Sequence, residues 1–480
     1  MSLASALNTT KATLSNTALQ SSVVSNNISN ASSTSYNRRA AVTTTDTSTG
    51  AIVVKVERAE DEALLKQALA ATSDDAGKQK FLDGMNSLSV VLGGEEYTAA
   101  PSTYLASLQN ALQTYAASPS DVTLASAAVS AASDVANALN TSTQAVQQLR
   151  TDADGEISDT VDKLNQLLSD FEKANNEVTS ATAAGRDANN AIDQREGLLK
   201  QISGIVGIST AVRTNNDVVI YTTDSTTLFE TTARKISFEP MAAYDANTTG
   251  NSIYIDGVAV KTGEGSNTSA KGSLPALLQL RDEVYPGYQS QLDEIARGVM
   301  GAFAETDSGG NSIAGLFTTK DGSEPDFTTA EVVPGLAGLI SVSSEAKATP
   351  VKLRDGNIAG DTPNTDGSTG YSDLLFKYAS ALNTQIEFDP KAGISTNVTL
   401  LSFATDSAGW VEEYRSNATS SAESTSAMLT KSTEAYSNST GVNLDEELIQ
   451  MLDIEQSYKA AAKLMSTIDE LLKTLMEAAN

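Results

Sequence analysis

The sequence contains no cysteine and no histidine among its 480 residues. Without cysteine there is no disulfide and no thiol nucleophile, and without histidine there is no Ser-His-Asp triad. Most zinc and iron sites are excluded as well, because their usual ligands are missing. Catalysis by carboxylates or lysine remains open, but we expect no cofactor and no metal site.

Aromatic residues and positive charge are also scarce. Only 5% of the residues are aromatic although 40% are hydrophobic, which favours thin, close-packed helices over a thick core. The net charge is −28, whereas nucleic acids and anionic membranes both select proteins with a basic face. We therefore expect neither of them as a partner.

Long apolar runs are missing too. No run approaches the roughly 20 apolar residues that cross a bilayer, and the N-terminus lacks the basic and apolar regions of a Sec signal peptide. We expect no membrane insertion, and export from the cell would need another route.

The last forty residues carry an unbroken heptad. Five residues follow one another at intervals of seven, and a second apolar series lies three residues after the first: Leu444, Met451, Tyr458, Met465 and Leu472, then Ile454, Ala461, Ile468 and Leu475. This is the a/d pattern of a coiled coil, which needs another helix to bury it.

The first thirty residues carry a weaker counterpart. Its apolar members are Leu7, Leu14 and Ile28 on one seven-residue series and Leu3 and Val24 on the adjoining one, with Thr10, Thr17 and Ser21 between them. Neither end can form a core alone. The two ends are expected to pair with each other, with copies of the same chain or with a partner.

The charges of the two ends are complementary. Residues 1–45 contain Lys11, Arg38 and Arg39 and no acid, whereas the stretch after Gly441 contains eight acids and three lysines. Exposed charges contribute little individually, but this distribution favours pairing of the ends. The alternative is two independent surface helices docked on a globular body.

The middle of the chain combines a long helix with a β insert. From Val135 to Val178 apolar residues recur at intervals of three and four, which predicts a helix of about seventy residues and a rod-like subunit. Gly155 and Gly185 are candidate interruptions of this helix. After Gly207 the period changes to two, and Asp256-Gly257 is typical of a hairpin turn.

We therefore expect a mainly α protein with a long helical coiled-coil rod built from both chain ends and a small inserted β domain. The expected domains are a terminal coiled-coil inner tube (1–45 with 437–480), a helical rod (46–206 with 263–436) and the β insert (207–262). The insert is expected to have a small core of its own and few contacts with the helices at its base.

Several motifs resemble a known family. Asn26–Asn30 (NNISN) followed by Tyr36 is similar to the N-terminal signature of the flagellar axial proteins, although the usual Pro-Gly before the tyrosine is missing here. Three further stretches, in family order, resemble the hook-associated proteins of the hook–filament junction: Asp193-Gln194-Arg195-Glu196 with 198–208, 271–284, and 441–447 with 456–463.

The resemblance implies a structural, non-enzymatic protein of the bacterial flagellum, secreted through the type III channel and located outside the cell. It implies a ring of copies of this chain that joins hook to filament. The implied partners are the hook protein, the next hook-associated junction protein and a cytosolic export chaperone. The candidate assembly or chaperone interface consists of Leu3, Leu7, Leu14, Val24, Ile28, Leu444, Met451, Ile454, Tyr458, Met465, Ile468, Leu472 and Leu475.

Three alternatives remain at this stage. The chain could be another axial subunit, flagellin-like in character. It could be a secreted enzyme that uses paired carboxylates, such as a glycosidase, with Trp410 as a stacking platform for sugar. It could also be an adhesin that binds a ligand through the β insert.

Overall fold

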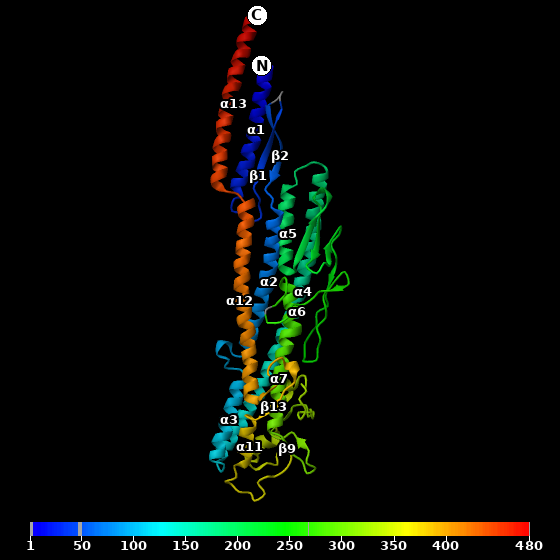
Figure 1. The fold of residues 1–480 in the computed structure, drawn as a ribbon, viewed down its shortest axis with the longest axis vertical. Helices are drawn as coiled ribbons and strands as arrows, with labels where there is room; N and C mark the ends of the chain where they lie inside the picture. The colour runs from blue at the N-terminus through cyan, green and yellow to red at the C-terminus, as the bar shows by residue number, and fades with distance from the viewer. Residues whose placement is uncertain (1–2, 47–49, 267, 480) are drawn as a thin grey trace. The chain divides into compact units, whose positions relative to one another are not determined.

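The computed structural model describes residues 3–46, 50–266 and 268–479 (Figure 1). Their contacts divide the chain into two compact units. Unit 1 comprises 1–75, 163–235 and 424–480, and unit 2 comprises 76–162 and 236–423. The mainly α fold with a small β component is confirmed.

Unit 1 contains both chain ends. Its elements are α1 (Leu3–Ser29), β1 (Arg39–Asp46), β2 (Gly50–Arg58), α5 (Asn189–Ile205), β3 (Ile208–Val212), β4 (Val218–Thr222), β5 (Thr227–Phe229) and α13 (Leu444–Ala479). β1 and β2 form an antiparallel pair whose register shifts between Val42 and Thr43. β3, β4 and β5 form a second, antiparallel sheet in that order.

Unit 2 is built around short helices and strand pairs. Its longer helices are α3 (Pro101–Ala117), α6 (Ser273–Gln279), α7 (Tyr285–Ala302) and α11 (Asp373–Ala381). The short helices are α8 (Leu336–Leu339), α9 (Ser344–Ala348) and α10 (Lys352–Asp355). The strands are β6 (Ile236–Ser237), β7 (Tyr254–Ile255), β8 (Val258–Ala259), β9 (Glu305–Thr306), β10 (Ser312–Ile313), β11 (Phe317–Thr319), β12 (Ile340–Val342), β13 (Gln385–Glu387) and β14 (Asn397–Thr399). The helices α2 (Glu62–Val91), α4 (Val122–Ala183) and α12 (Leu400–Thr440) contribute residues to both units.

The predicted long helix is α4, which has 62 residues. Asp121 begins it, since its carboxylate accepts hydrogen bonds from the backbone N–H of Thr123 and Leu124. The predicted apolar stripe, including Leu139, Val146, Leu164 and Val178, is buried. Gly155 was a candidate interruption, but it lies within the continuous helix. The helix ends before Gly185, which has a positive φ of 64°.

α4 is also the one helix of the described residues that is apolar and long enough to cross a membrane by length and composition alone. Helices packed in the interior of soluble proteins pass the same test, and 39% of the relevant 18-residue window is buried. This is weak support for a membrane span, and the expectation of no membrane insertion stays a prediction.

The β insert exists, and Asp256-Gly257 forms the predicted hairpin turn between β7 and β8, with positive φ at both residues. For the part of the insert before Ile236, the expectation of a separate core with few helical contacts is wrong. Phe229 packs edge-on against Phe171 of α4, and the Asn175 side chain of α4 bonds Asp217 and the N–H of Val218. Strands of two to five residues bury too little apolar surface to form a core without a helix.

The insert is also divided between the two units. β3–β5 belong to unit 1, whereas β6–β8 belong to unit 2, where they form their own small sheet. The three-domain division expected from the sequence is not tested by this grouping and stays a prediction.

Pro286 is accommodated within a continuous helical run. The segment Leu280–Val284, directly before α7, has π-helical hydrogen bonding, which shifts the ladder where proline lacks a donor. This segment carries Arg281, a fully buried cation of unit 2.

Candidate assembly interface

α1 and α13 lie side by side and antiparallel, and they bring the two chain ends together within unit 1 (Figure 1). α12 ends before Gly441, and Asn443 starts α13 by accepting the N–H of Asp445 at 3.0 Å. Three acids in the first turn of α13 interact favourably with the positive end of its dipole. The predicted pairing of the two ends is therefore present within one chain.

One heptad row of α13 is buried. Ile454, Ala461 and Ile468 are 8%, 3% and 6% exposed, and Glu447, one heptad earlier, is fully buried. On α1 the buried residues of the corresponding row are Thr10, Thr17 and Val24. The hydroxyls of the two threonines donate to carbonyls of their own helix, those of Ala6 and Thr13, so these polar side chains can be buried without loss of hydrogen bonding.

The other predicted row of α13, which begins at Leu444, is only partly covered in the single chain. Met451, Met465 and Leu472 are half-buried, whereas Leu444 is 48% and Tyr458 51% exposed. Leu475, the last member of the buried row, is 64% exposed. On α1, Val24 is buried, and Leu3, Leu7, Leu14 and Ile28 are half-buried. The a/d seam thus keeps an open side.

α13 also exposes apolar residues that the heptad did not include. Nine of the eighteen exposed large hydrophobic side chains among the described residues lie on this helix. Those outside the predicted set are Leu448, Ile449, Leu452, Leu464, Leu471 and Met476. The period could not identify them; the signal was the total apolar content of α13. Concentrations of exposed apolar side chains on one element are typical of interaction surfaces.

A groove of about 540 Å³ lies between the two helices, lined by Thr17, Ala18 and Ser21 of α1 and by Met451, Ile454, Glu455 and Tyr458 of α13. It arises because small residues of α1 face large residues of α13. The Ser21 hydroxyl and the Met451 sulfur lie 3.7 Å apart at its edge.

The family motifs at the two ends meet in a polar cluster, which we call the clasp: Asn27, Tyr36, Arg38, Arg39 and Glu447. The Asn27 amide nitrogen donates to Glu447 Oε2 at 2.9 Å and to the Arg39 carbonyl at 2.8 Å. Its oxygen accepts from the Tyr36 hydroxyl at 2.7 Å and from the Arg39 N–H at 3.0 Å. Arg38 donates to Glu447 Oε1 at 2.6 Å. Burial raises the pKa of Tyr36, so this hydroxyl remains a donor.

The Asp193–Glu196 motif forms a second cluster in unit 1. The buried Arg58 donates to Asp193 at 2.6 Å and to Glu196 at 2.5 Å. Tyr436 donates to Glu196 at 2.6 Å, and burial raises the pKa of this tyrosine to about 12. Arg39 of the clasp reaches Asp193 at 2.9 Å and so joins the two clusters.

Arg195 of the same motif points to the insert. It donates to the Asn216 carbonyl at 2.5 Å and to Asn175 at 3.1 Å, and burial lowers its pKa to about 10. The motif therefore holds the β1–β2 pair with its carboxylates and the β3–β4 connection with its arginine. The motif is recognisable in the sequence, whereas these partners are not.

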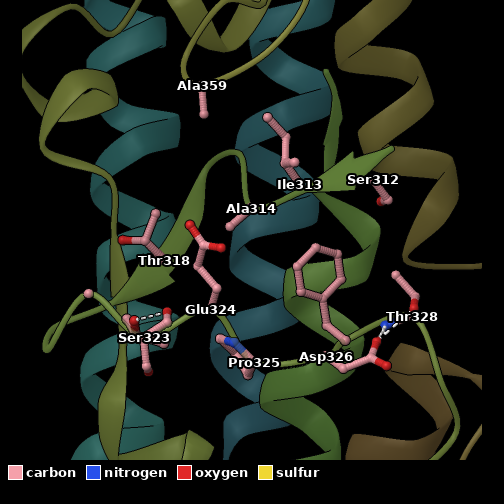
Figure 2. A pocket seen from close by; sticks show the side chains of 13 residues that line it. Ser312, Ile313, Ala314, Thr318, Ser323, Glu324, Pro325, Asp326, Thr328 and Ala359 are labelled. Atoms are coloured by element: carbon pink, nitrogen blue, oxygen red, sulfur yellow. Dashed lines mark hydrogen bonds between the residues drawn. The ribbon is translucent and has the colours of Figure 1, made fainter. Parts of the chain in front are cut away.

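Unit 2 has a pocket of about 700 Å³ among the loops and strands of 312–328 (Figure 2). Its polar side chains bond locally: Asp326 accepts from the N–H and hydroxyl of Thr328, and Asp321 accepts from Ser323. They do not converge on a common point. The pocket therefore offers no argument for a ligand.

The features needed for the enzyme alternative are engaged in structural contacts. Trp410 packs on Tyr414 with ring centroids 4.1 Å apart. The buried carboxylates of Asp154, Asp293 and Glu305 each accept at least two protein hydrogen bonds. In the part of the chain that the structure describes, no group of three acidic side chains is arranged to hold a metal ion.

The coverage of α13 predicts its dynamics. We expect hydrogen exchange of the isolated protein to be faster along the part of α13 after Ile468 than along α4, because Leu471, Leu475 and Met476 are more than half exposed in the single chain. α1 is covered both by α13 and by β1–β2 and should exchange more slowly than α13. Equal protection of α13 and α4 would contradict the view that its outer face is unpartnered.

Two models of flagellar protein families match separate segments of this chain. The model of the flagellar hook-associated protein FlgK helical domain matches residues 85–321, and the C-terminal model of the flagellar basal body rod FlgEFG proteins matches residues 433–478. Flagellar hook-associated protein 1 of Escherichia coli K12 is 22% identical over 528 residues, which cover 94% of this chain and 95% of that protein. Its counterpart in Bacillus subtilis 168 is 24% identical and covers 70% of this chain and 68% of that protein.

Among solved structures, the flagellar hook junction protein FlgK from Burkholderia pseudomallei is 21% identical, with a TM-score of 0.42 over 53% of this chain and 46% of that chain. A likeness this partial carries no argument about the fold.

The matches to the central helical domain and to α13 define the class as the axial structural proteins of the bacterial flagellum. Within this class the chain is similar to FlgK, the flagellar hook-associated protein, both in the helical-domain match over residues 85–321 and in the relative from Escherichia coli K12 that aligns with 94% of the chain. The resemblance seen in the motifs is thereby confirmed.

Proposed function

We propose that this chain is a junction subunit that joins hook to filament as a ring of identical copies. The observation that carries the proposal is the asymmetry of the terminal pair. α1 is covered on two sides, by α13 and by β1–β2, whereas α13 leaves nine large apolar side chains in solvent. Burying such a face in an assembly is favourable at roughly 25 cal/mol per Å² of apolar surface.

The charges favour copies arranged with α13 of one against α1 of the next. α13 carries eight acids and three lysines, whereas α1 carries Lys11 and no acid. Two α13 helices in contact would repel each other. Contacts between α13 and a neighbouring α1 use two different surfaces, and such interfaces close into rings when the rotation permits.

The remaining partners follow from the family. The names of the relatives describe hook-associated proteins, and we propose the hook protein and the next hook-associated junction protein as neighbours along the axis. We also propose export through the flagellar type III channel to the cell exterior. A cytosolic chaperone would cover α13 before export, because an exposed apolar helix promotes aggregation.

The assembly proposal is tested by placing charge on the open face. Leu464 and Leu471 are 58% and 51% exposed, so Leu464→Asp with Leu471→Asp should change the stability of the isolated chain by at most about 0.5 kcal/mol per site. In cells lacking the native protein, we expect the variant to be exported but filaments not to attach. Secreted protein, motility and attached filaments are measured together.

The matched control adds the same charge elsewhere on α13, as Gln456→Asp with Ser466→Asp, at two exposed polar positions. This control should support filament attachment. If the leucine variant attaches filaments as well as the control does, the exposed face of α13 is not an assembly surface.

A further inference from the structure

We infer that Glu447, held by Asn27 and Arg38, selects which face of α13 packs on α1. The argument begins with the composition of the buried row. This row consists of Glu447, Ile454, Ala461 and Ile468, so it includes a charged residue and an alanine. The exposed faces carry larger side chains, including Leu448 with Leu452 and Leu464 with Leu471.

Apolar burial favours the a/d seam but separates the faces of α13 incompletely. Rotation of α13 toward Leu448 and Leu452, or toward Leu464 and Leu471, would still bring two leucines to α1 in place of Ile454 and Ile468. Two of the buried positions of α1, Thr10 and Thr17, are small and could accommodate either arrangement. A polar determinant can therefore add to the selection that the apolar seam makes.

The clasp is that determinant. Glu447 is 0% exposed, and both of its carboxylate oxygens are occupied, one by Asn27 at 2.9 Å and the other by Arg38 at 2.6 Å. A buried carboxylate requires such partners. Rotating α13 would remove Glu447 from both donors and place another side chain against the Asn27 amide. The penalty falls on the alternative packings, in the way that a buried polar residue specifies pairing in a coiled coil.

The clasp also connects α13 to the rest of unit 1. Asn27 is fixed by Tyr36 and by the backbone of Arg39, and the Arg39 side chain reaches Asp193 of α5. The orientation of α13 is thereby tied to α5 rather than to α1 alone. This gives a physical role to two motifs at opposite ends of the chain, NNISN and the segment after Gly441.

The inference concerns the single chain and holds whether or not rings form. If the proposed assembly is correct, the clasp decides which leucines of α13 are presented to a neighbour. The test therefore uses the isolated protein, so that its outcome is independent of filament attachment.

The test exploits the absence of cysteine, because two introduced cysteines are the only thiols. Ser21→Cys is combined with Met451→Cys for the observed face, since these side chains lie 3.7 Å apart. Ser21→Cys is also combined with Leu452→Cys or Leu448→Cys, which represent other apolar faces at a similar position along α13. Its combination with Asp453→Cys represents a polar face. Crosslinking by a short bismaleimide is followed by mass spectrometry.

Each pair is measured in the native background and with Glu447→Met, which keeps a good helix former and leaves the partly exposed Arg38 able to reach water. Native protein should crosslink at 21–451. With Glu447→Met we expect crosslinking at 21–452 or 21–448 to rise at least tenfold, while 21–453 stays low. Glu446→Met, at the exposed neighbouring position, should behave as native.

Two results would overturn the inference. If Glu447→Met shows no more crosslinking at 21–452 and 21–448 than Glu446→Met does, apolar packing selects the face without the clasp. If all pairs rise together, including 21–453, and helicity by circular dichroism falls, Glu447 holds the helices together but does not choose between faces.

Discussion

Replacing Arg281 with methionine is expected to destabilise unit 2 by about 3–5 kcal/mol, the usual cost of removing one partner of a buried ion pair. The Arg281 side chain is 1% exposed and donates to Asp154 at 2.6 Å, and the Asp154 side chain is fully buried. Asp154 would keep its bonds from the Tyr244 hydroxyl and the Met241 N–H but would lose its countercharge. Its ionised form would then be buried without compensation.

This expectation is measured by urea unfolding of the full chain, with limited proteolysis to assign the transition to unit 2. The double variant Asp154→Asn with Arg281→Met should recover much of the loss, because no charge is left buried. Arg213→Met breaks a partly exposed pair with Asp217 and should cost at most about 1 kcal/mol. If Arg281→Met costs no more than Arg213→Met, the buried pair does not have the role assigned to it.

The stability of unit 2 is expected to fall as the pH rises from about 4 to about 7, because of Asp293 on α7. This residue is 1% exposed, and burial raises the pKa of its carboxyl from 3.8 to about 7. Three donors partly offset the effect of burial on the pKa: the N–H groups of Gly335 and Ala337 and the amide of Gln289. The neighbouring Glu294 raises the pKa further.

The sign follows from proton binding. Between the two pKa values the folded protein keeps the proton of Asp293 whereas the unfolded chain releases it, so rising pH favours unfolding. The contribution is fully present below the unfolded value of 3.8 and is lost as the pH passes about 7. A shift of about three units corresponds to at most about 4 kcal/mol.

Asp293→Asn should remove this pH dependence, because the amide is neutral at every pH and can still accept hydrogen bonds. The measurement is the urea midpoint at pH 5 and pH 8 for the two proteins. Asp307→Asn serves as the control: hydrogen bonds from Asn311 lower the pKa of this exposed carboxyl, so it does not titrate between these two values. An unchanged pH slope in Asp293→Asn would show that another group is responsible.

The local structure was predictable from the sequence where it depends on residues close together in the chain. The period of three and four predicted α4. Asp256-Gly257 predicted the hairpin turn. The family could be recognised because short motifs keep their order along the chain, and no tertiary contact is needed to read them.

The sequence also predicted that the two ends pair with each other, with copies of the chain or with a partner, because each carries an apolar row without a core of its own. It did not establish which rows meet. The buried positions of α1 include Thr10 and Thr17, which sequence reasoning treated as weakening the seam. They can be buried because each hydroxyl bonds its own helix backbone, a possibility that hydrophobic patterning does not register.

Only the tertiary structure decided the role of the polar motifs. Asn27 and Glu447 are 420 positions apart and meet in a fully buried hydrogen bond. In the same way, Arg58 meets Asp193 and Glu196 across more than 130 positions, and the β3–β5 part of the insert packs against Asn175 and Phe171 of α4. Periodicity records the preferences of a segment and its neighbours in sequence. The choice among several apolar faces, and the partner of each buried charge, depends on groups that only the folded chain brings within hydrogen-bonding distance.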